Sequence, residues 1–358
     1  MDTYYLILFV AFLLCFFDFV SYRGPKLFVY CIFCLIVIFL ISFRKIGNDN
    51  DSQMYESMFY IYSKSTINEL IEGGYGYVEK GYTFLNKFIG ELGGTFRNVL
   101  MVMAIATAAV NYSFFVKKTN FIFISLLAYL SFFLIYRDFT QIRYGLCAAF
   151  CFWCIDNFIE KKYVRSLVFF LLAFSFHNSA LILLPALPFL KYFKNKKVLI
   201  LLPIPCFILG SLVNFFPLLL IYGYSNAHMD EYLKEEGGGG YAISIFGYFL
   251  ILIYYIFDRY SKKIVFTENQ NFYFRILAFS VSLNLLFVQS AIFQRFTFIL
   301  FQCSIIVISI LLFMARKHIK RKENFFILYF CLSVFYLIYG IRIINPELIR
   351  PYEISFSE

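Results

Sequence analysis

Four ionisable side chains fall within or at the edge of long apolar stretches of the sequence. They are Arg143, His177, Arg275 and Arg295. A charged group at membrane depth is costly, so such residues are functional candidates. Arginine keeps its charge and presents a planar fork of donors that fits phosphate oxygens. Arg143, His177 and Arg295 therefore predict a site for an anionic, phosphate-containing group toward one side of a membrane.

Each of these residues also has an ordinary explanation. Arg143 and Arg295 lie at predicted span boundaries, where a long basic side chain can reach the membrane surface. His177 could hydrogen-bond a free carbonyl at a helix break. Arg275 lies near the predicted cytoplasmic start of its span, and we interpret it as a surface-reaching side chain.

Acidic candidates come from the segment 44–97. Asp49 and Asp51 have the D-x-D spacing that can hold a divalent metal against a diphosphate, although short acidic pairs are common in solvated loops. Glu79 precedes Tyr82 in a segment rich in aromatic side chains of the kind that stack on sugar rings. Its carboxylate could accept the proton of an attacking hydroxyl, or it could be an ordinary solvated group.

The composition is that of a membrane protein. Hydrophobic residues make up 61% of the 358 residues and charged residues only 15%, with a mean hydropathy of +0.74. The net charge of +10 comes from short basic clusters between apolar runs, so it does not indicate a nucleic-acid surface. The sequence has no P-loop, nucleophile elbow or H-E-x-x-H motif, which argues against an ATP-driven transporter, a serine hydrolase and a zinc protease.

A transmembrane helix needs about 20 apolar residues. The predicted spans are Tyr4–Val20, Leu27–Phe43, Asn98–Val116, Phe121–Tyr136, Gln141–Ile159, Val198–Tyr222, Tyr241–Phe257, Phe272–Ala291, Phe296–Met314 and Phe325–Ile341. We expect the first to be retained, because it has neither a basic start nor a cleavage site. Ser166–Leu190 fits one long span or two half-length helices that meet at His177.

Charge decides the topology. All the basic clusters can face the cytoplasm only if Ser166–Leu190 enters the membrane and returns, so we predict a hairpin with its turn at Phe176–Ser179. Irregular backbone at that depth lines a cavity or is buried in protein. The outward side then receives both termini, the loops 44–97 and 223–240, and the turns Arg137–Thr140 and Gln289–Arg295. We interpret Gly237–Gly240 as a flexible linker.

Five sequence blocks, in order, resemble the EpsG-like polysaccharide polymerases, relatives of the Wzy-type O-antigen polymerases. The blocks are Arg44 to Asp51 with Tyr55 and Phe59, Glu79 to Asn86, Gln141 to Arg143 and onward, Phe176 to Pro185, and Gln294 with Arg295. The histidine and glutamate blocks are the most specific, and the late arginine is the least specific. Asp51 fits the family aspartate better than Asp49 does.

The resemblance implies an all-α bundle of about 10–12 spans in one domain over residues 1–358, similar to C-type membrane glycosyltransferases. It implies a bacterial inner-membrane enzyme, without metal or cofactor, that joins undecaprenyl-pyrophosphate-linked repeat units into O-antigen or capsular polysaccharide at the outer face. Its partners would be the lipid-linked donor and acceptor, membrane lipid and a chain-length regulator. It assigns catalysis to His177, Glu79 and Asp51, and substrate binding to Arg143, Arg295, Arg44, Tyr55, Tyr82, Gln141 and Gln294.

Three other functions remain open at this stage. A flippase for lipid-linked oligosaccharides would also bind pyrophosphate, but its cations should be spread along a path through the membrane. A membrane acyltransferase could use His177 as its base, but it would not need several arginines at one depth. A related ligase-type transferase would share the site. Within the polymerase, His177 and Glu79 both qualify as the base toward the acceptor hydroxyl.

Overall fold

The computed structural model describes residues 1–73, 78–215, 240–260 and 265–356. Within these ranges the chain is helical, and its only extended pairing is a pair of isolated bridges. Eight of the described helices are long and apolar enough to cross a membrane. The protein is therefore an all-α, multi-pass membrane protein, and the predicted fold class is confirmed. The chain divides into two compact units.

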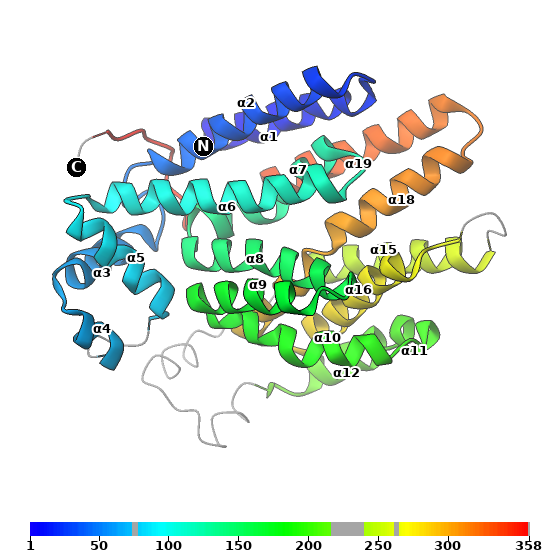
Figure 1. Cartoon of the computed structure of the whole chain (residues 1–358). Helices are drawn as coiled ribbons and strands as arrows, with labels where there is room; N and C mark the ends of the chain where they lie inside the picture. The colour runs from blue at the N-terminus through cyan, green and yellow to red at the C-terminus, as the bar shows by residue number, and fades with distance from the viewer. Residues whose placement is uncertain (74–77, 216–239, 261–264, 357–358) are drawn as a thin grey trace. The chain divides into compact units, whose positions relative to one another are not determined.

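The first unit comprises residues 1–154, 164–178 and 312–358. Its long helices include α2 (Arg23–Ser42) beside α6 (Phe96–Lys118) and α1 (Asp2–Leu14) beside α19 (Lys322–Arg342), as Figure 1 shows. Its elements are α1 (Asp2–Leu14), η1 (Cys15–Phe19), α2 (Arg23–Ser42), α3 (Ser52–Lys64), α4 (Ile67–Glu72), α5 (Lys80–Glu91), α6 (Phe96–Lys118), α7 (Ile122–Tyr129), the π-helix η2 (Leu130–Phe139), most of α8 (Ile142–Ile159), α9 (Tyr163–Phe176) and α19 (Lys322–Arg342).

Segment 44–97, predicted as a long loop, instead folds into α3, α4 and α5. Helix α3 buries Tyr55, Phe59 and Tyr62, which recur at helical spacing on one face. Helix α4 begins with a capping box between Thr66 and Glu69. Because α3 packs on α5, the segment is a small helical layer, and the loop prediction is wrong in this respect.

The two ends of the first unit are fastened by different contacts. At one end, the C-terminal tail pairs with the start of segment 44–97: Lys45 N–H donates to the Glu353 carbonyl and Arg350 N–H to that of Asn48, each at 2.9 Å. At the other end, the buried Asp18 carboxylate caps α7 through the Phe123 N–H. The tail and segment 44–97, which we predicted to face the same side, therefore do lie together.

The predicted break in Ser166–Leu190 is present. Helix α9 ends at Phe176, and a short 3₁₀ turn, η3 (Asn178–Ile182), begins after His177. The chain passes from the first unit to the second at this point. The return of the second arm across the membrane remains a prediction.

The second unit comprises residues 155–163 and 179–311 and is built around α16. Nearly every side chain from Phe272 to Leu285 is buried, because other helices pack around α16. The elements are α10 (Leu183–Tyr192), α11 (Lys196–Leu201), α12 (Pro203–Leu212), α15 (Ala242–Tyr260), α16 (Glu268–Leu286), α17 (Ala291–Phe301) and the first part of α18 (Ser304–His318).

Two predicted turns, Arg137–Thr140 and Gln289–Arg295, are shorter than predicted, because a helix takes up part of each. Arg137 and Asp138 lie in the last turn of η2, and Gln294 and Arg295 lie inside α17. Asp138 and Gln294 each have a buried hydrogen-bond partner there, the Tyr129 hydroxyl and the Asn284 carbonyl, respectively. Most of the predicted loop 223–240, including Gly237–Gly239, lies outside the described residues.

Candidate functional site

The centre of the candidate site is an ion pair between two residues that are 64 positions apart in the sequence. Glu79 is the N-cap residue of α5, and Arg143 lies in the first turn of α8. Arg143 Nη1 donates to Glu79 Oε2 at 2.5 Å. The side chain of Glu79 is 7% exposed and that of Arg143 is 15% exposed, so the pair is largely shielded but can be reached.

Two tyrosine rings enclose the guanidinium of Arg143. Its central carbon lies 5.5 Å from the ring centroid of Tyr55 on α3 and 5.7 Å from that of Tyr82 on α5. The two rings meet edge to face at 5.7 Å. Burial raises the pKa of Tyr55 to about 12 and also raises the pKa of Tyr82, so both phenols stay protonated near neutral pH.

The helix break at His177 reaches the same carboxylate. The Asn178 N–H, which directly follows His177, donates to Glu79 Oε1 at 3.1 Å. The His177 ring lies edge to face with Tyr144 of α8 at 5.3 Å. The backbone carbonyl of His177 accepts a hydrogen bond from Cys147 Sγ at 3.4 Å. Glu79, Arg143 and His177 are thus brought together within the first unit.

A close approach of α5 to the end of α9 sets this geometry. A Cβ atom added to Gly81 would lie 2.6 Å from the carbonyl oxygen of Ser175, a separation that real side chains essentially never show. An apolar cluster that includes Tyr55, Tyr82 and Leu146 supports the site, with Phe176 packed against it. The glycine and the cluster explain why the Glu79 block stands beside the His177 block.

Arg44 and Asp49 form a second, more deeply buried pair. Arg44 Nε donates to Asp49 Oδ2 at 3.0 Å, with side chains 0% and 1% exposed. Asp49 Oδ1 also accepts from the N–H groups of Asp51 and Ser52. These contacts fix the start of α3, so the D-x-D spacing serves a turn here. Asp51 is the N-cap residue of α3 and is half-buried.

The remaining predicted residues are in different settings. Gln141 is half-buried just before α8. In the second unit, Gln294 is buried and donates to the Asn284 carbonyl at 3.0 Å, whereas its neighbour Arg295 is exposed. Arg275 pairs with Glu268 at 2.7 Å. The joint action of Arg295 with Arg143 stays a prediction.

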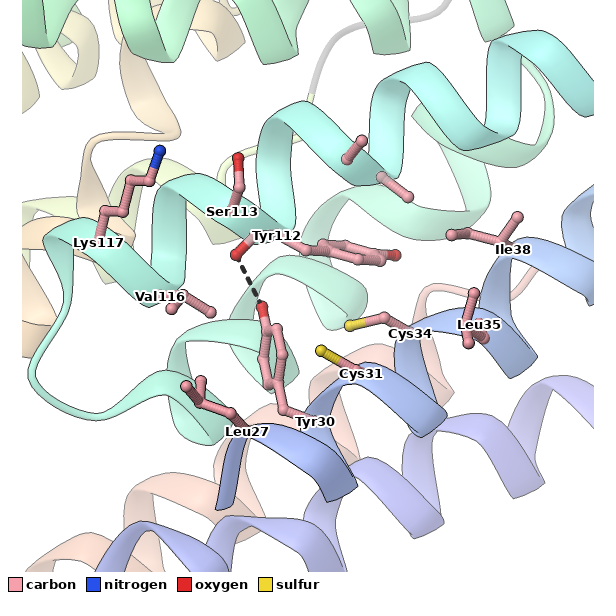
Figure 2. A pocket seen from close by; sticks show the side chains of 12 residues that line it. Leu27, Tyr30, Cys31, Cys34, Leu35, Ile38, Tyr112, Ser113, Val116 and Lys117 are labelled. Carbon is pink, nitrogen blue, oxygen red and sulfur yellow. Dashed lines mark hydrogen bonds between the residues drawn. The ribbon is translucent and has the colours of Figure 1, made fainter. Parts of the chain in front are cut away.

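An apolar groove between α2 and α6 lies apart from this set of residues (Figure 2). It has a volume of about 450 Å³ and is lined by Tyr30, Cys34 and Tyr112, among others. Figure 2 shows Tyr30 donating to the backbone carbonyl of Tyr112 across it, at 3.1 Å. None of the predicted site residues lines this groove.

Sequence reasoning missed the pairing of Glu79 with Arg143, which had been given separate roles. It also missed Tyr144 and Arg137. Tyr144 directly follows Arg143, but an aromatic residue in an apolar run carries no signal of its own. Arg137 falls in a predicted turn, although an arginine beside a span is itself a signal.

The arrangement offers three chemical capacities in one place. A cation can bind phosphate oxygens, an imidazole can take a proton, and aromatic rings can stack on sugars. The carboxylate of Glu79 holds both the guanidinium and the backbone next to the imidazole.

Comparison with known proteins gives a consistent family assignment. The sequence model of the EpsG family matches residues 27–354. The amylovoran biosynthesis protein AmsC of Erwinia amylovora is 24% identical over 385 residues, with 99% of this chain and 98% of that protein covered. No solved structure gave a significant match. Because the family match extends over far more than half of the chain, the protein belongs to the EpsG family.

Proposed function

We propose that the protein is a polysaccharide polymerase that joins lipid-pyrophosphate-linked repeat units at the outer face of a bacterial inner membrane. The relative from Erwinia amylovora is a biosynthesis protein for the polysaccharide amylovoran, which supports this class of product. The main structural support is the convergence of the aspartate-tyrosine, glutamate, arginine and histidine blocks around the Glu79–Arg143 pair.

The reaction transfers a growing glycan from its lipid pyrophosphate to a hydroxyl of the next unit. The oxygen of that hydroxyl attacks the anomeric carbon, and the bond to the pyrophosphate oxygen breaks. The leaving group gains negative charge, which Arg143 stabilises through its several N–H donors. The hydroxyl proton passes to a base as the new bond forms.

We assign the base role to His177. Both oxygens of Glu79 already accept hydrogen bonds, from Arg143 and from the Asn178 N–H. With both oxygens engaged in these contacts, the carboxylate is less available to the acceptor hydroxyl. Glu79 instead orients the guanidinium and the backbone beside the imidazole. Tyr55 and Tyr82 position Arg143 and shield it from water.

Gene deletion and complementation test this function in cells. Deletion should abolish the ladder of long surface glycan on a gel and leave a single repeat unit on the lipid carrier. Wild type should restore the ladder, and Arg143→Lys should not, because an ammonium cannot reproduce the bidentate fork. Loss of all surface glycan in the deletion strain would indicate a flippase instead. A normal ladder with Arg143→Lys would show that Arg143 contributes only a positive charge that sets the topology.

A further inference from the structure

A buried arginine lies next to the site without being part of it. Arg137 belongs to the last turn of the π-helix η2 and is only 2% exposed, so its side chain is shielded from solvent. Burying a cation inside a membrane protein is costly, and such residues are usually kept for a function. π-Helical segments are rare and are frequently found at functional sites.

Arg137 packs against aromatic ring faces. Its guanidinium carbon lies 3.9 Å from the ring centroid of Phe133, on its own helix, and 5.2 Å from that of Tyr144 on α8. The neighbouring acid, Asp138, accepts from the hydroxyl of Tyr129 at 2.8 Å. The guanidinium of Arg137 therefore lies between the ring of Phe133 on η2 and the ring of Tyr144 in the first turn of α8.

The ring of Tyr144 continues this series of contacts to the proposed base. Tyr144 is 5% exposed, and its plane lies at 84° to the imidazole of His177. One turn further along α8, Cys147 donates to the carbonyl of His177. Helix α8 thus holds both the ring and the backbone of the histidine.

The approach of η2 to α8 is unusually close. A Cβ atom added to Gly145 would lie 3.1 Å from the carbonyl oxygen of Arg137 and 3.1 Å from Asp138 Oδ1. This contact holds the backbone of Arg137 against the first turn of α8, where Tyr144 lies.

We propose that Arg137 is a positioning residue that fixes the orientation of His177 through the ring of Tyr144. This inference rests on the proposed function, because it takes His177 as the base. Arg137 does not touch the reacting groups. It holds the phenol ring, and the phenol ring holds the imidazole toward the acceptor hydroxyl.

Turnover of the purified full chain with a lipid-linked repeat unit gives the first test. Arg137→Met should lower kcat about 10- to 100-fold with KM unchanged, because a misplaced catalytic group costs that much while Arg143 is intact. Arg137→Lys should recover part of the loss, because it keeps a cation over the ring. Tyr144→Leu should lower kcat as Arg137→Met does. It provides the same test of the positioning role if Arg137→Met fails to fold.

A double-mutant cycle decides whether Arg137 acts through His177. In a His177→Gln background, Arg137→Met should cause no further loss of kcat. If Arg137→Met still lowers kcat by its full factor in the His177→Gln background, the arginine acts independently of the histidine and the inference is overturned.

A chemical readout separates this inference from the polymerase proposal. Diethyl pyrocarbonate modifies neutral imidazole, and replacing His228 and His318 by Gln leaves His177 as the only histidine. Arg137→Met should raise the rate of His177 modification at least about twofold, because the ring is less restrained. Lys117→Met is the matched control, because it removes a cation that lies 5.2 Å from the ring of Trp153, further along α8 than Tyr144. It should leave the rate of His177 modification unchanged.

The outcomes are distinguishable. An unchanged modification rate in both Arg137→Met and Tyr144→Leu overturns the positioning role, whether or not the protein polymerises glycan. A wild-type protein without turnover contradicts the proposed function, while the modification rates still report whether Arg137 restrains His177.

Discussion

The candidate site residues include two buried ion pairs with different surroundings. The Glu79–Arg143 pair is partly accessible and lies beside aromatic rings and a helix break. The Arg44–Asp49 pair is fully enclosed, and its members also bind the Ile41 carbonyl at the end of α2 and the Ser52 N–H at the start of α3. The first pair is suited to meeting a substrate, and the second to holding the segment that carries Asp51 and Tyr55.

This contrast predicts that Arg44→Met acts on stability. Removing one partner of a buried ion pair leaves the other charge uncompensated, which costs about 3–5 kcal/mol. We expect a lowered midpoint of thermal unfolding and less protein in the membrane. Asp51→Asn is the control: it should keep the unfolding midpoint and lose polymer. A normal midpoint in Arg44→Met would contradict the enclosed pair.

At the residue level, the sequence predicted the identity of the site residues better than their partners. The unusual placement of Arg143 and His177 in apolar runs made them visible. Nothing in the sequence indicates that Glu79 reaches Arg143, because that contact depends on how α5 packs against α8 and α9. The Arg44–Asp49 pair was likewise hidden, since it depends on the turn between α2 and α3.

At the level of elements, the close contact of α5 with α9 brings the glutamate block to the histidine block. Gly81→Ala should separate these helices, because its Cβ would clash with the carbonyl of Ser175. Polymer should fall at least about tenfold, since small displacements of catalytic groups have large effects. Gly24→Ala is the matched control, because no heavy atom lies within 4 Å of its added Cβ, and it should be active. Full activity of Gly81→Ala would refute this contact.

The C-terminal tail braces the start of segment 44–97. A chain that ends at residue 348 loses the hydrogen bonds from Arg350, Tyr352 and Ser355 to Asn48, Leu40 and Phe43, respectively. We expect faster proteolysis within residues 43–51 and reduced polymer. Glu353→Ala removes only an exposed ion pair, worth about 0–1 kcal/mol, and should behave as wild type. Equal proteolysis of the truncated and full-length proteins would exclude a bracing role.

The elements show where apolar runs are informative and where they are not. Long apolar runs predicted the spans α2, α6, α8 and α19 well, and the His177 break followed from charge balance. The helices of segment 44–97 were missed because they are only half apolar. The periodic Tyr55, Phe59 and Tyr62 and the Thr66–Glu69 capping box were the available signals.

On the scale of the whole molecule, the described contacts of the first unit place the tail and segment 44–97 together at one end and residues of two basic clusters at the other. The tail and segment 44–97 share one end, whereas Lys26 pairs with Asp18 and Arg316 lies over Phe121 at the other. The positive-inside prediction requires the basic clusters to share one end, and the side of the membrane that this end faces stays a prediction. Lys262, which belongs to one of the basic clusters, and Gly238, which belongs to the predicted loop 223–240, lie outside the described residues.

Cysteine labelling of whole cells tests the topology. In a cysteine-free background, cysteines at Lys45 and Glu353 should react with an impermeant reagent, and cysteines at Lys118 and Lys322 should react only after permeabilisation. A cysteine at Lys196 should also be protected if the chain returns after His177. External labelling at Lys196 would contradict the hairpin prediction. External labelling at Lys118 would show that the first unit has the opposite orientation in the membrane.

Turnover of the purified protein with a lipid-pyrophosphate-linked repeat unit tests the central claim most directly. We predict that wild type forms polymer and releases lipid pyrophosphate. His177→Gln should lower kcat by about 100-fold or more while donor binding is retained, because Gln cannot take the proton. Glu79→Gln should weaken donor binding as well, because it loosens Arg143. Absence of polymer from the wild-type protein, or near-normal turnover of His177→Gln beside an inactive Glu79→Gln, would contradict the account.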